Sequence, residues 1–439
     1  MLASPVVRSS TWAALLLGWT LPAVAQDIVT LEEALTRARA ANARLPIPAF
    51  EVSIARERHN EARAERWLRV AVEGDFIYAP PSGYDPVVTN SGEFRLQAIA
   101  RQHLYDGGAR RSAVDRAEAE VAAAGQRYRI EEKDLELEVT SRYNEILAAE
   151  QESAARREGI ARLESYTTAL KSRKASGQPV APDILKTEVR LASEQASLLE
   201  AEKRAVDARL ELNDRMGLEP DAALRVAPLP PLDPSRGLGE PAPWEETPDV
   251  AAARADAKMA EAAAAIARAE RKPHLDLQAD VGFWGSDTSR WIPGDLKAAD
   301  PNATFADRVR RDAGYSASLT LVWPVFDFGA IKARIAQADL ALREATQKVE
   351  VARRDARLKW FQAKSAMETL AREVDLLSRS APAARDALLD AESRYRGGAA
   401  TSLEVLDAYA SAVDAAVRLA DATARFRIAR ALASRWGTP

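Results

Sequence analysis

The sequence predicts a mainly α-helical protein that also carries four β-strands suited to crossing a membrane, with its longest helices arranged as two hairpins. Three observations predict this fold class. A set of short motifs recurs in the second half of the chain at a nearly constant spacing. A heptad pattern of apolar residues runs through a long stretch of each half. Four segments between the helices alternate apolar and polar residues, which is typical of strands with two different faces.

The composition excludes several classes of protein. The 439 residues contain no cysteine, which excludes disulfides, thiolate metal sites, a cysteine nucleophile and a lipidated cysteine anchor. His59, His103 and His274 lie far apart in the sequence, so we expect no metal site and no other cofactor. A formal net charge of -4 argues against nucleic-acid binding, which needs a basic surplus. Paired carboxylates, a nucleophile with a base, and a phosphate-binding loop are all missing from the sequence pattern, so we expect no enzymatic activity.

The N-terminal segment is typical of a secretory signal peptide. Residues 1–25 contain one early basic residue, Arg8, then a short apolar run and an Ala23-Val24-Ala25 cleavage motif. Pro22 breaks the run just before this motif, and the run is too short to span a bilayer. The alternative is an apolar N-terminal helix of the mature fold. We expect export, a mature chain that begins at Gln26, and no transmembrane helix.

Two structural repeats are expected, at 26–217 and 248–439, joined by a proline-rich linker at 218–247. The motif Tyr105-Asp-Gly-Gly-Ala109 recurs as Phe326-Asp-Phe-Gly-Ala330, which is 221 residues later (326 minus 105). Other matches keep the same order at nearly this spacing, so two halves of one architecture are the simplest interpretation.

Each repeat is expected to contain a short helix, a long helix and a return helix. Apolar residues recur at alternating spacings of four and three from Ile331 to Tyr395, and less regularly at the matching positions of the first repeat. This spacing predicts long helices of about 65 residues, roughly 97 Å each. Pro382 is expected to kink the second long helix or to change its winding. The expected short and return helices lie near 49–66, 183–216, 248–271 and 403–436.

The four predicted strands have one apolar side and one polar side. Alternation is strict in Leu275–Phe283 and Tyr315–Trp323 and weaker near 68–78 and 94–101. Strands of this length can cross a membrane at a tilt, and aromatic residues at strand ends are typical of membrane girdles. The alternative is the half-exposed sheet of a soluble protein, which has the same period. The predicted girdle consists of Trp67, Tyr105, Trp284, Tyr315, Trp323 and Phe326.

Four strands are too few to close a membrane barrel, because an open sheet in lipid leaves two edges unpaired. We therefore expect copies of the chain to associate, with eight strands in a dimer or twelve in a trimer. The polar strand faces would then line a wet lumen. The loops at 79–91 and 285–313 would face outside, and the long helices would extend the barrel into the periplasm.

The chain after residue 25 resembles the TolC-like outer-membrane efflux protein family. It is similar to the family at Thr30-Leu-Glu-Glu-Ala-Leu35, Leu104-Tyr-Asp-Gly-Gly108, Val325-Phe-Asp-Phe-Gly329 and the two hairpin turns. The resemblance implies a homotrimer in the outer membrane, with a 12-stranded β-barrel over a periplasmic α-barrel of long helices. It also implies a passive exit duct of a tripartite efflux or type I secretion system, carrying small molecules or polypeptides. A periplasmic adaptor protein would dock onto it, and an inner-membrane pump would drive transport.

The resemblance also implies residue roles at the periplasmic tips. Repeated around a trimer, the tip acids would form rings that attract cations. The family's arginine in the second turn is replaced by Ala400, so Arg394 or Arg396 would have to pair with Asp183. The alternative is that the acids only favour helix starts. The implied gate residues are Asp183, Tyr395, Glu404 and Asp407. The implied adaptor-docking residues are Gly177, Gly397, Gly398 and Ser402.

Two other classes of protein remain open from the residues alone. A periplasmic adaptor also uses a long helical hairpin, although adaptors normally show one hairpin and an inner-membrane tether. An exported coiled-coil scaffold would make the strands an ordinary sheet, and it would be extracted from cells without detergent.

Overall fold

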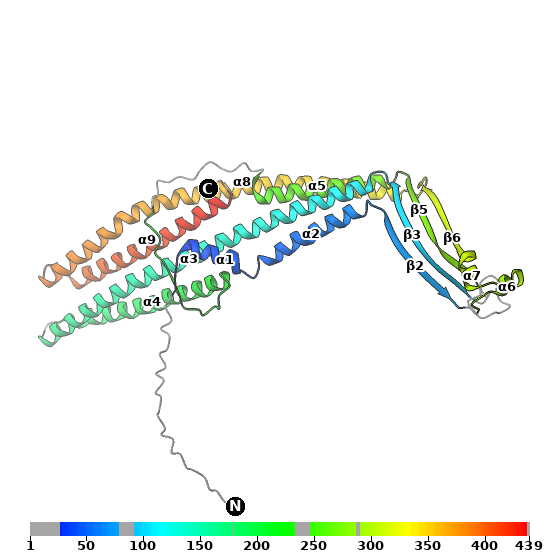
Figure 1. Cartoon of the computed structure of the whole chain (residues 1–439). Helices are drawn as coiled ribbons and strands as arrows, with labels where there is room; N and C mark the ends of the chain where they lie inside the picture. The colour runs from blue at the N-terminus through cyan, green and yellow to red at the C-terminus, as the bar shows by residue number, and fades with distance from the viewer. Residues whose placement is uncertain (1–26, 79–91, 178, 233–245, 287–289, 437–439) are drawn as a thin grey trace, which may run out of the picture.

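The molecule is elongated, with a long bundle of helices at one end and a curved β-sheet at the other (Figure 1). The computed structural model describes residues 27–78, 92–177, 179–232, 246–286 and 290–436. The predicted signal peptide at 1–25 and the predicted loop at 79–91 lie outside the described residues. The helices are α1 (Leu31–Ala41), α2 (Pro46–Ala64), α3 (Ala109–Ala175), α4 (Ala181–Arg215), α5 (Pro248–Ala269), α6 (Gly294–Ala299), α7 (Phe305–Asp312), α8 (Ala330–Arg396) and α9 (Ser402–Trp436). The strands are β1 (Asp27–Val29), β2 (Arg69–Ile77), β3 (Glu93–Tyr105), β4 (Leu224–Val226), β5 (His274–Ser286) and β6 (Ala313–Val322).

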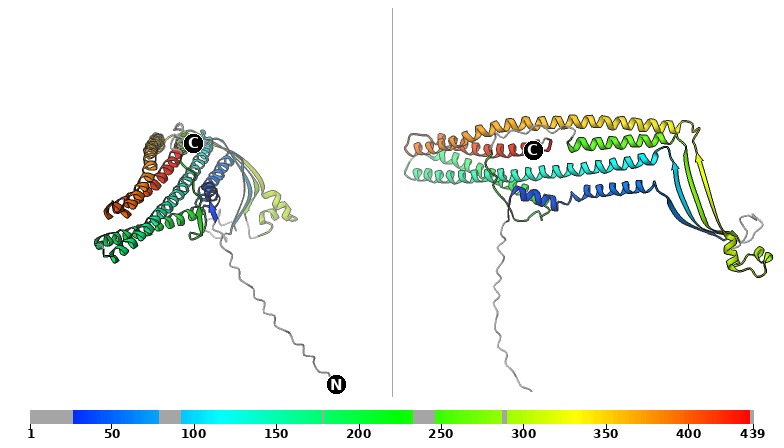
Figure 2. Two further views of the ribbon diagram at one scale, coloured as in Figure 1. Left: turned by 90° about the vertical axis from the view of Figure 1, so that its left-hand side faces the viewer. Right: turned by 45° about the horizontal axis from the view of Figure 1, so that its top comes forward.

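Two helical hairpins make up the helical end. The chain turns back from α3 into α4 and from α8 into α9, and both turns lie at the end farthest from the sheet (Figure 1 and Figure 2). α3 and α8 have 67 residues each, which corresponds to about 100 Å. The mainly helical character predicted from the sequence is confirmed. α8 continues through Pro382 as one helix, because its contacts with α5 and α9 support it along its length and the proline removes only one backbone donor.

Small clusters of apolar side chains, rather than one large core, hold the long helices together. Alanine occupies much of the helix seams and buries little area per residue, so each cluster depends on a large side chain. Tyr409 of α9 shows how tightly these anchors fit. It packs over Gly159 of α3, where a Cβ atom would lie 2.9 Å from Tyr409 Cε2 and 3.0 Å from Cζ. The anchors of the five clusters are Tyr143, Trp360, Tyr395, Tyr409 and Phe426.

A two-stranded parallel sheet of β1 and β4 fastens the start of the described chain to the segment that follows α4. The hydroxyl of the fully buried Tyr143 lies 3.0 Å from the carbonyl oxygen of Val29 and 2.6 Å from that of Ala227. Asn42 ends α1 nearby, and its Nδ2 donates to the carbonyl oxygen of Arg215 at 2.9 Å. β4 lies within 218–247, so part of the predicted linker is an ordered strand. A strand of three residues is too short to show a periodic pattern in the sequence.

The second sheet has four antiparallel strands in the order β2-β3-β5-β6. The segment 285–313, predicted as a loop, contains the short helices α6 and α7. The prediction was incomplete because capping decides the start of α7. The Thr304 hydroxyl accepts from the Asp307 N–H at 3.4 Å, and the Asp307 carboxylate accepts from the Thr304 N–H at 2.9 Å. Among the described residues, no helix is both long enough and apolar enough to cross a membrane.

Candidate functional site

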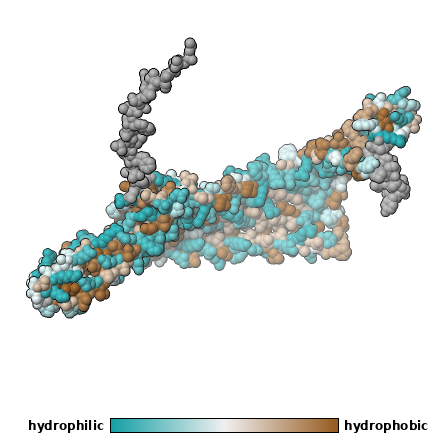
Figure 3. All heavy atoms as spheres, turned by 90° about the horizontal axis from the view of Figure 1, so that it is seen from below, coloured by the Kyte–Doolittle hydropathy of each residue, from teal (hydrophilic) through white to brown (hydrophobic). Residues whose placement is uncertain are grey.

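The strand register gives the four-stranded sheet one face that is apolar except for Gln102, which lies next to Leu277 near the helix end. Side chains paired across neighbouring strands point to the same side, and one such rung joins Val72, Ala98, Val281 and Tyr315. Brown, hydrophobic surface is prominent toward the sheet end of the molecule, whereas teal covers much of the helical body (Figure 3). A contiguous apolar face of this size needs an apolar environment or a partner. Its large exposed side chains are Val70, Val72, Phe76, Leu96, Val281, Tyr315, Leu319 and Leu321.

The opposite face of the same sheet is polar. Arg101 donates to Glu73 at 3.3 Å and to Gln278 at 3.2 Å, across three neighbouring strands. The Ser316 hydroxyl donates to the carboxylate of Asp280 at 2.6 Å. These side chains pair with one another along the face and remain open to solvent, so this face suits contact with water.

The outer strands of the sheet, β2 and β6, each have one edge without a strand partner in the described chain. Water can satisfy the backbone groups of such an edge, whereas hydrocarbon leaves each unsatisfied group at a cost of several kcal/mol. An apolar face and two open edges are therefore compatible with lipid only if further strands pair with both edges.

The aromatic residues of the predicted girdle lie at the two ends of the sheet. Tyr105 pairs with Leu275 across a β-bulge, which turns Tyr105 onto the apolar face. Leu275 and Trp284 are nine residues apart on β5 (284 minus 275), which is about 30 Å along the strand and roughly 23 Å at a tilt of about 40°. At the helix end of the sheet are Trp67, Tyr105, Trp323 and Phe326, and toward the far end are Trp284 and Tyr315.

Trp284 differs from the other aromatic residues because the register places it on the polar face. It pairs with Arg95, and Arg95 pairs with Asp75. Its indole lies over Gly314 of β6, where a Cβ atom would come 2.6 Å from Cη2 of the ring. The girdle prediction rests on position at a strand end, whereas the register decides the face, and here the two disagree.

The tips of the two hairpins share a small core that includes the predicted gate residue Tyr395. The ring of Tyr166 meets the ring of Tyr395 edge-on, with 5.1 Å between centroids. The guanidinium of Arg173 lies 4.6 Å from the Tyr395 centroid. Burial raises the pKa of Tyr166, so its hydroxyl stays protonated at neutral pH. Tyr395 therefore joins the first hairpin to the second. The buried members of this core are Leu170, Ile184, Tyr395 and Val405.

The predicted gate acids have different surroundings. Glu404 accepts from Arg394 Nη2 at 2.9 Å and from the Thr401 N–H at 3.3 Å, while the Thr401 hydroxyl accepts from the Glu404 N–H at 3.3 Å. This is a capping box at the start of α9. Asp183 is half-buried in the first turn of α4, and Asp407 is exposed on α9. Arg394 pairs with Glu404 rather than with Asp183, and across the described residues neither Asp183 nor Asp407 has an ion-pair partner.

The predicted docking turns are open surface at the end of the molecule. Gly177 and Gly398 have φ of 86° and 77°, a left-handed conformation that favours glycine. A Cβ atom at either position would meet nothing within 4 Å. Gly397 is also exposed but has an ordinary helical φ of -79°. Ser402 differs from the glycines, because its side chain is buried at the start of α9.

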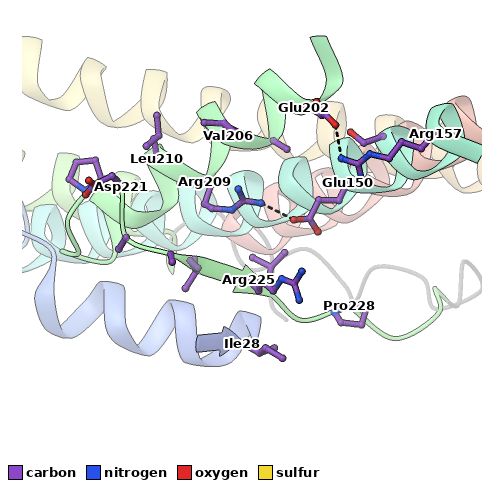
Figure 4. A pocket seen from close by; sticks show the side chains of 17 residues that line it. Ile28, Glu150, Arg157, Glu202, Val206, Arg209, Leu210, Asp221, Arg225 and Pro228 are labelled. Carbon is purple, nitrogen blue, oxygen red and sulfur yellow. Dashed lines mark hydrogen bonds and ion pairs between the residues drawn. The ribbon is translucent and has the colours of Figure 1, made fainter. Parts of the chain in front are cut away.

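A cavity of about 1050 Å³ lies beside α3, α4 and β4 (Figure 4). Two ion pairs belong to its wall, Arg209 with Glu150 at 2.9 Å and Arg157 with Glu202 at 2.5 Å. Sequence patterns do not reveal this cavity, because it forms where β4 folds back beside the first hairpin. In the part of the chain that the structure describes, no group of three or more acidic or histidine side chains could hold a metal ion.

Comparisons with known proteins agree with this architecture. A family model described as outer membrane efflux protein matches residues 22–218 and 244–438. The pyoverdine export outer membrane protein OpmQ of Pseudomonas aeruginosa is 28% identical over 312 residues, which cover 68% of this chain and 61% of OpmQ. The chain thus spans less than two thirds of the length of that relative.

Two solved structures share the fold. A membrane protein from Pseudomonas aeruginosa superposes with a TM-score of 0.80 at 22% identity, covering 92% of this chain and 93% of that one. The outer membrane protein VceC from Vibrio cholerae superposes with a TM-score of 0.78 at 18% identity, covering 93% of this chain and 96% of VceC. Because the family model covers most of the sequence, the chain belongs to the outer membrane efflux protein family, a family of efflux channels, and its location is the outer membrane.

Proposed function

We propose that three copies of the chain join their sheets edge to edge into a 12-stranded outer-membrane β-barrel, which an α-barrel of the long helices continues into the periplasm. One observation carries this proposal: the sheet combines an exposed apolar face, a polar opposite face and two open edges. Pairing β6 of one copy with β2 of the next removes every edge, puts the apolar face toward lipid and encloses the polar face. The precursor would carry a signal peptide at 1–25, and the repeats at 26–217 and 248–439 would each supply two strands and one hairpin, with 218–247 between them.

The assembled tube would be the exit duct of a tripartite efflux or type I secretion system. It would conduct small molecules or polypeptides passively, since a polar wall offers a path rather than a chemical step. The name of OpmQ, which states pyoverdine export, supports a small-molecule cargo. The energy for transport would come from an inner-membrane pump, linked to the duct through a periplasmic adaptor.

The hairpin tips would form the periplasmic entrance. The exposed turns at Gly177, Gly397 and Gly398 would receive the adaptor, and the buried Ser402 would support the turn from inside. The remaining tip residues would narrow the entrance. Asp183, Glu404 and Asp407 would form acidic rings, and Tyr395 would hold the two hairpins of each copy together.

Aromatic residues would mark the two borders of the membrane. Trp67, Tyr105, Trp323 and Phe326 would lie at the periplasmic border, and Tyr315 would lie toward the outer one. Tyr315 pairs with Val281, six residues from Leu275 on β5 (281 minus 275), which is about 20 Å along the strand and roughly 16 Å at a tilt of about 40°. Both levels therefore fit within the apolar band of about 25 Å that membrane barrels show.

The mass and conductance of detergent-purified protein test the proposal. We expect a particle of three chains that forms ion-conducting pores in planar bilayers. Recovery as a monomer without detergent would refute the duct. Charge reversal of both Glu404 and Asp407 to lysine should weaken block by multivalent cations added on the tip side, whereas Glu344→Lys, on α8 far from the tip, should not. Equal block in both variants would remove the two acids from the entrance.

A further inference from the structure

A pocket of about 290 Å³ lies on the polar face of the sheet, at the end farthest from the long helices, where the short α6 and α7 also lie (Figure 1). This volume is near the lower end of the range for pockets that hold small organic molecules. Two adjacent rungs of the register supply its polar-face side chains, so the pocket belongs to one face of a hydrogen-bonded sheet rather than to a loop. The first rung is Asp75, Arg95 and Trp284, and the second is Ile77, Glu93 and Ser286.

The indole of Trp284 lies close to the sheet because two neighbouring positions are glycines. Gly282 and Gly314 are register partners on the same face, one rung deeper than Trp284. A Cβ atom at Gly314 would lie 2.6 Å from Cη2 and 2.7 Å from Cζ2 of the indole, so the ring occupies the space that a side chain there would fill. Trp284 is nevertheless 42% exposed. The ring therefore lies close to the β6 backbone at Gly314 while much of the side chain stays accessible to solvent.

The charges around the pocket favour a positively charged molecule. Among the residues that line the pocket, Asp75 and Glu93 supply two carboxylates against one guanidinium, that of Arg95, whose Nη1 lies 4.0 Å from the Asp75 carboxylate. The Arg308 guanidinium, which donates to the Ser286 carbonyl oxygen, is paired with the Asp312 carboxylate and so adds no net charge. An aromatic face attracts cations through its quadrupole and stacks with other flat rings. An open indole beside a surplus of carboxylates therefore suits one chemical class best, which is organic cations with planar aromatic rings.

We propose that Trp284, with Asp75 and Glu93, forms a subsite for planar aromatic cations at the outer mouth of the duct. The inference rests on the proposed function, since the polar face lines a lumen only when copies of the sheet close into a barrel. The pocket lies at the outer mouth because the long helices α3 and α8 begin at the opposite, periplasmic end of the same strands (Figure 1). Closure of three sheets gives three such subsites around the opening, where departing cargo passes.

Block of single pores by ethidium tests this subsite. Full-length protein is placed in planar bilayers, and ethidium is added on the side opposite the hairpin tips. We expect Trp284→Ala to raise the half-blocking concentration about fivefold, the loss of one exposed cation–aromatic contact. Trp284→Phe should retain most of the block. Trp323→Ala, which removes an exposed tryptophan at the other end of the sheet, should leave the block unchanged.

Glu93→Gln keeps the indole in place and examines the charge separately. We expect it to raise the half-blocking concentration about twofold, and this variant remains informative if Trp284→Ala fails to assemble. If Trp284→Ala pores, or Glu93→Gln pores where Trp284→Ala does not assemble, are as sensitive to ethidium as wild-type pores, the subsite is overturned while the duct stands. Wild-type protein that forms no pore would overturn the proposed function and the subsite together.

Discussion

Replacing Gly159 with alanine should not stabilise the protein, although alanine is the better helix former. In an unobstructed helix interior this change is favourable by about 1 kcal/mol. Gly159, however, lies under the ring of Tyr409, where the new Cβ atom would be 2.9 Å from Cε2 and 3.0 Å from Cζ. Tyr409 is 2% exposed and has little room to move. Overpacking of this kind costs about 1–3 kcal/mol, so the net effect should range from neutral to a loss of about 2 kcal/mol.

Gly125→Ala is the matched control, because Gly125 lies in the same helix and a Cβ atom there would meet nothing within 4 Å. This variant should gain the full helix propensity, about 1 kcal/mol. The difference between the two variants then isolates the steric cost, about 1–3 kcal/mol. Unfolding in denaturant, followed by far-ultraviolet circular dichroism in detergent, gives the ordering. Gly159→Ala that is as stable as Gly125→Ala would refute the close packing of α9 on α3.

Tyr409→Phe provides a rescue for the same contact. The Tyr409 hydroxyl is buried and has no hydrogen-bond partner in the described part of the chain, and burial raises the pKa of this tyrosine, so its hydroxyl stays neutral. Removing the hydroxyl alone should be neutral or stabilising by about 1 kcal/mol. Combined with Gly159→Ala it also removes the atom nearest the new Cβ. The double variant should therefore be more stable than the sum of the single effects predicts.

Two further predictions concern ion pairs that hold the hairpins in place. The Arg435 side chain is 4% exposed and donates to Asp249 at 2.8 Å and to an aspartate of α3. Arg435→Ala removes the buried cation, while the carboxylates that remain are 49% and 27% exposed and can be hydrated. The loss of these charge-assisted hydrogen bonds should cost about 1.5–3 kcal/mol in denaturant unfolding, and a loss below about 0.5 kcal/mol would contradict the contact. Glu158 accepts from Arg162, which lowers the pKa of Glu158 below 4.5, and Arg385 lowers it further. A carboxylate whose pKa is lower in the folded state than in the unfolded state stabilises the fold at any pH above the unfolded-state pKa. This stabilisation is lost as the pH falls through the folded-state pKa. Glu158→Gln should therefore reduce the acid sensitivity of stability between about pH 5 and about pH 3, and an unchanged pH profile would argue against it.

Periodic elements could be predicted from the sequence because their signal lies in neighbouring residues. The heptad seam from Ile331 to Tyr395 follows one helix, α8, and the alternation of Leu275–Phe283 follows one strand, β5. The pairing of β1 with β4 could not be predicted. Each strand has three residues, which is too short for a pattern, and the pair depends on the buried hydroxyl of Tyr143 more than 100 residues away from Val29 in sequence (143 minus 29).

The functional residues show the same limit more sharply. Residue type and order identified the turns at Gly177 and Gly398, because a left-handed position favours glycine regardless of tertiary contacts. The ion-pair partner of Arg394 depends on how the second turn folds back, and in the structure this partner is Glu404. The face of Trp284 depends on register across three strands, information that no single strand carries.

At the junctions where strands pass into the long helices, one residue adopts a strained conformation that a membrane environment would explain. Asp106 and Asp327 start α3 and α8 alike, each accepting from the N–H of the glycine two residues on, at 2.9 Å and 3.1 Å. Between these residues the first junction has Gly107 at φ 67°, and the second has Phe328 at φ 53°. A left-handed phenylalanine costs roughly 1–2 kcal/mol. Its side chain is 92% exposed in one chain, where the contact within reach is an edge-on one with Phe326 at 4.6 Å. In the proposed barrel both rings lie at the periplasmic border of the membrane, where burial of an aromatic side chain offsets the strain. The conformation of Phe328 is therefore better explained by an outer-membrane setting than by the isolated chain in water.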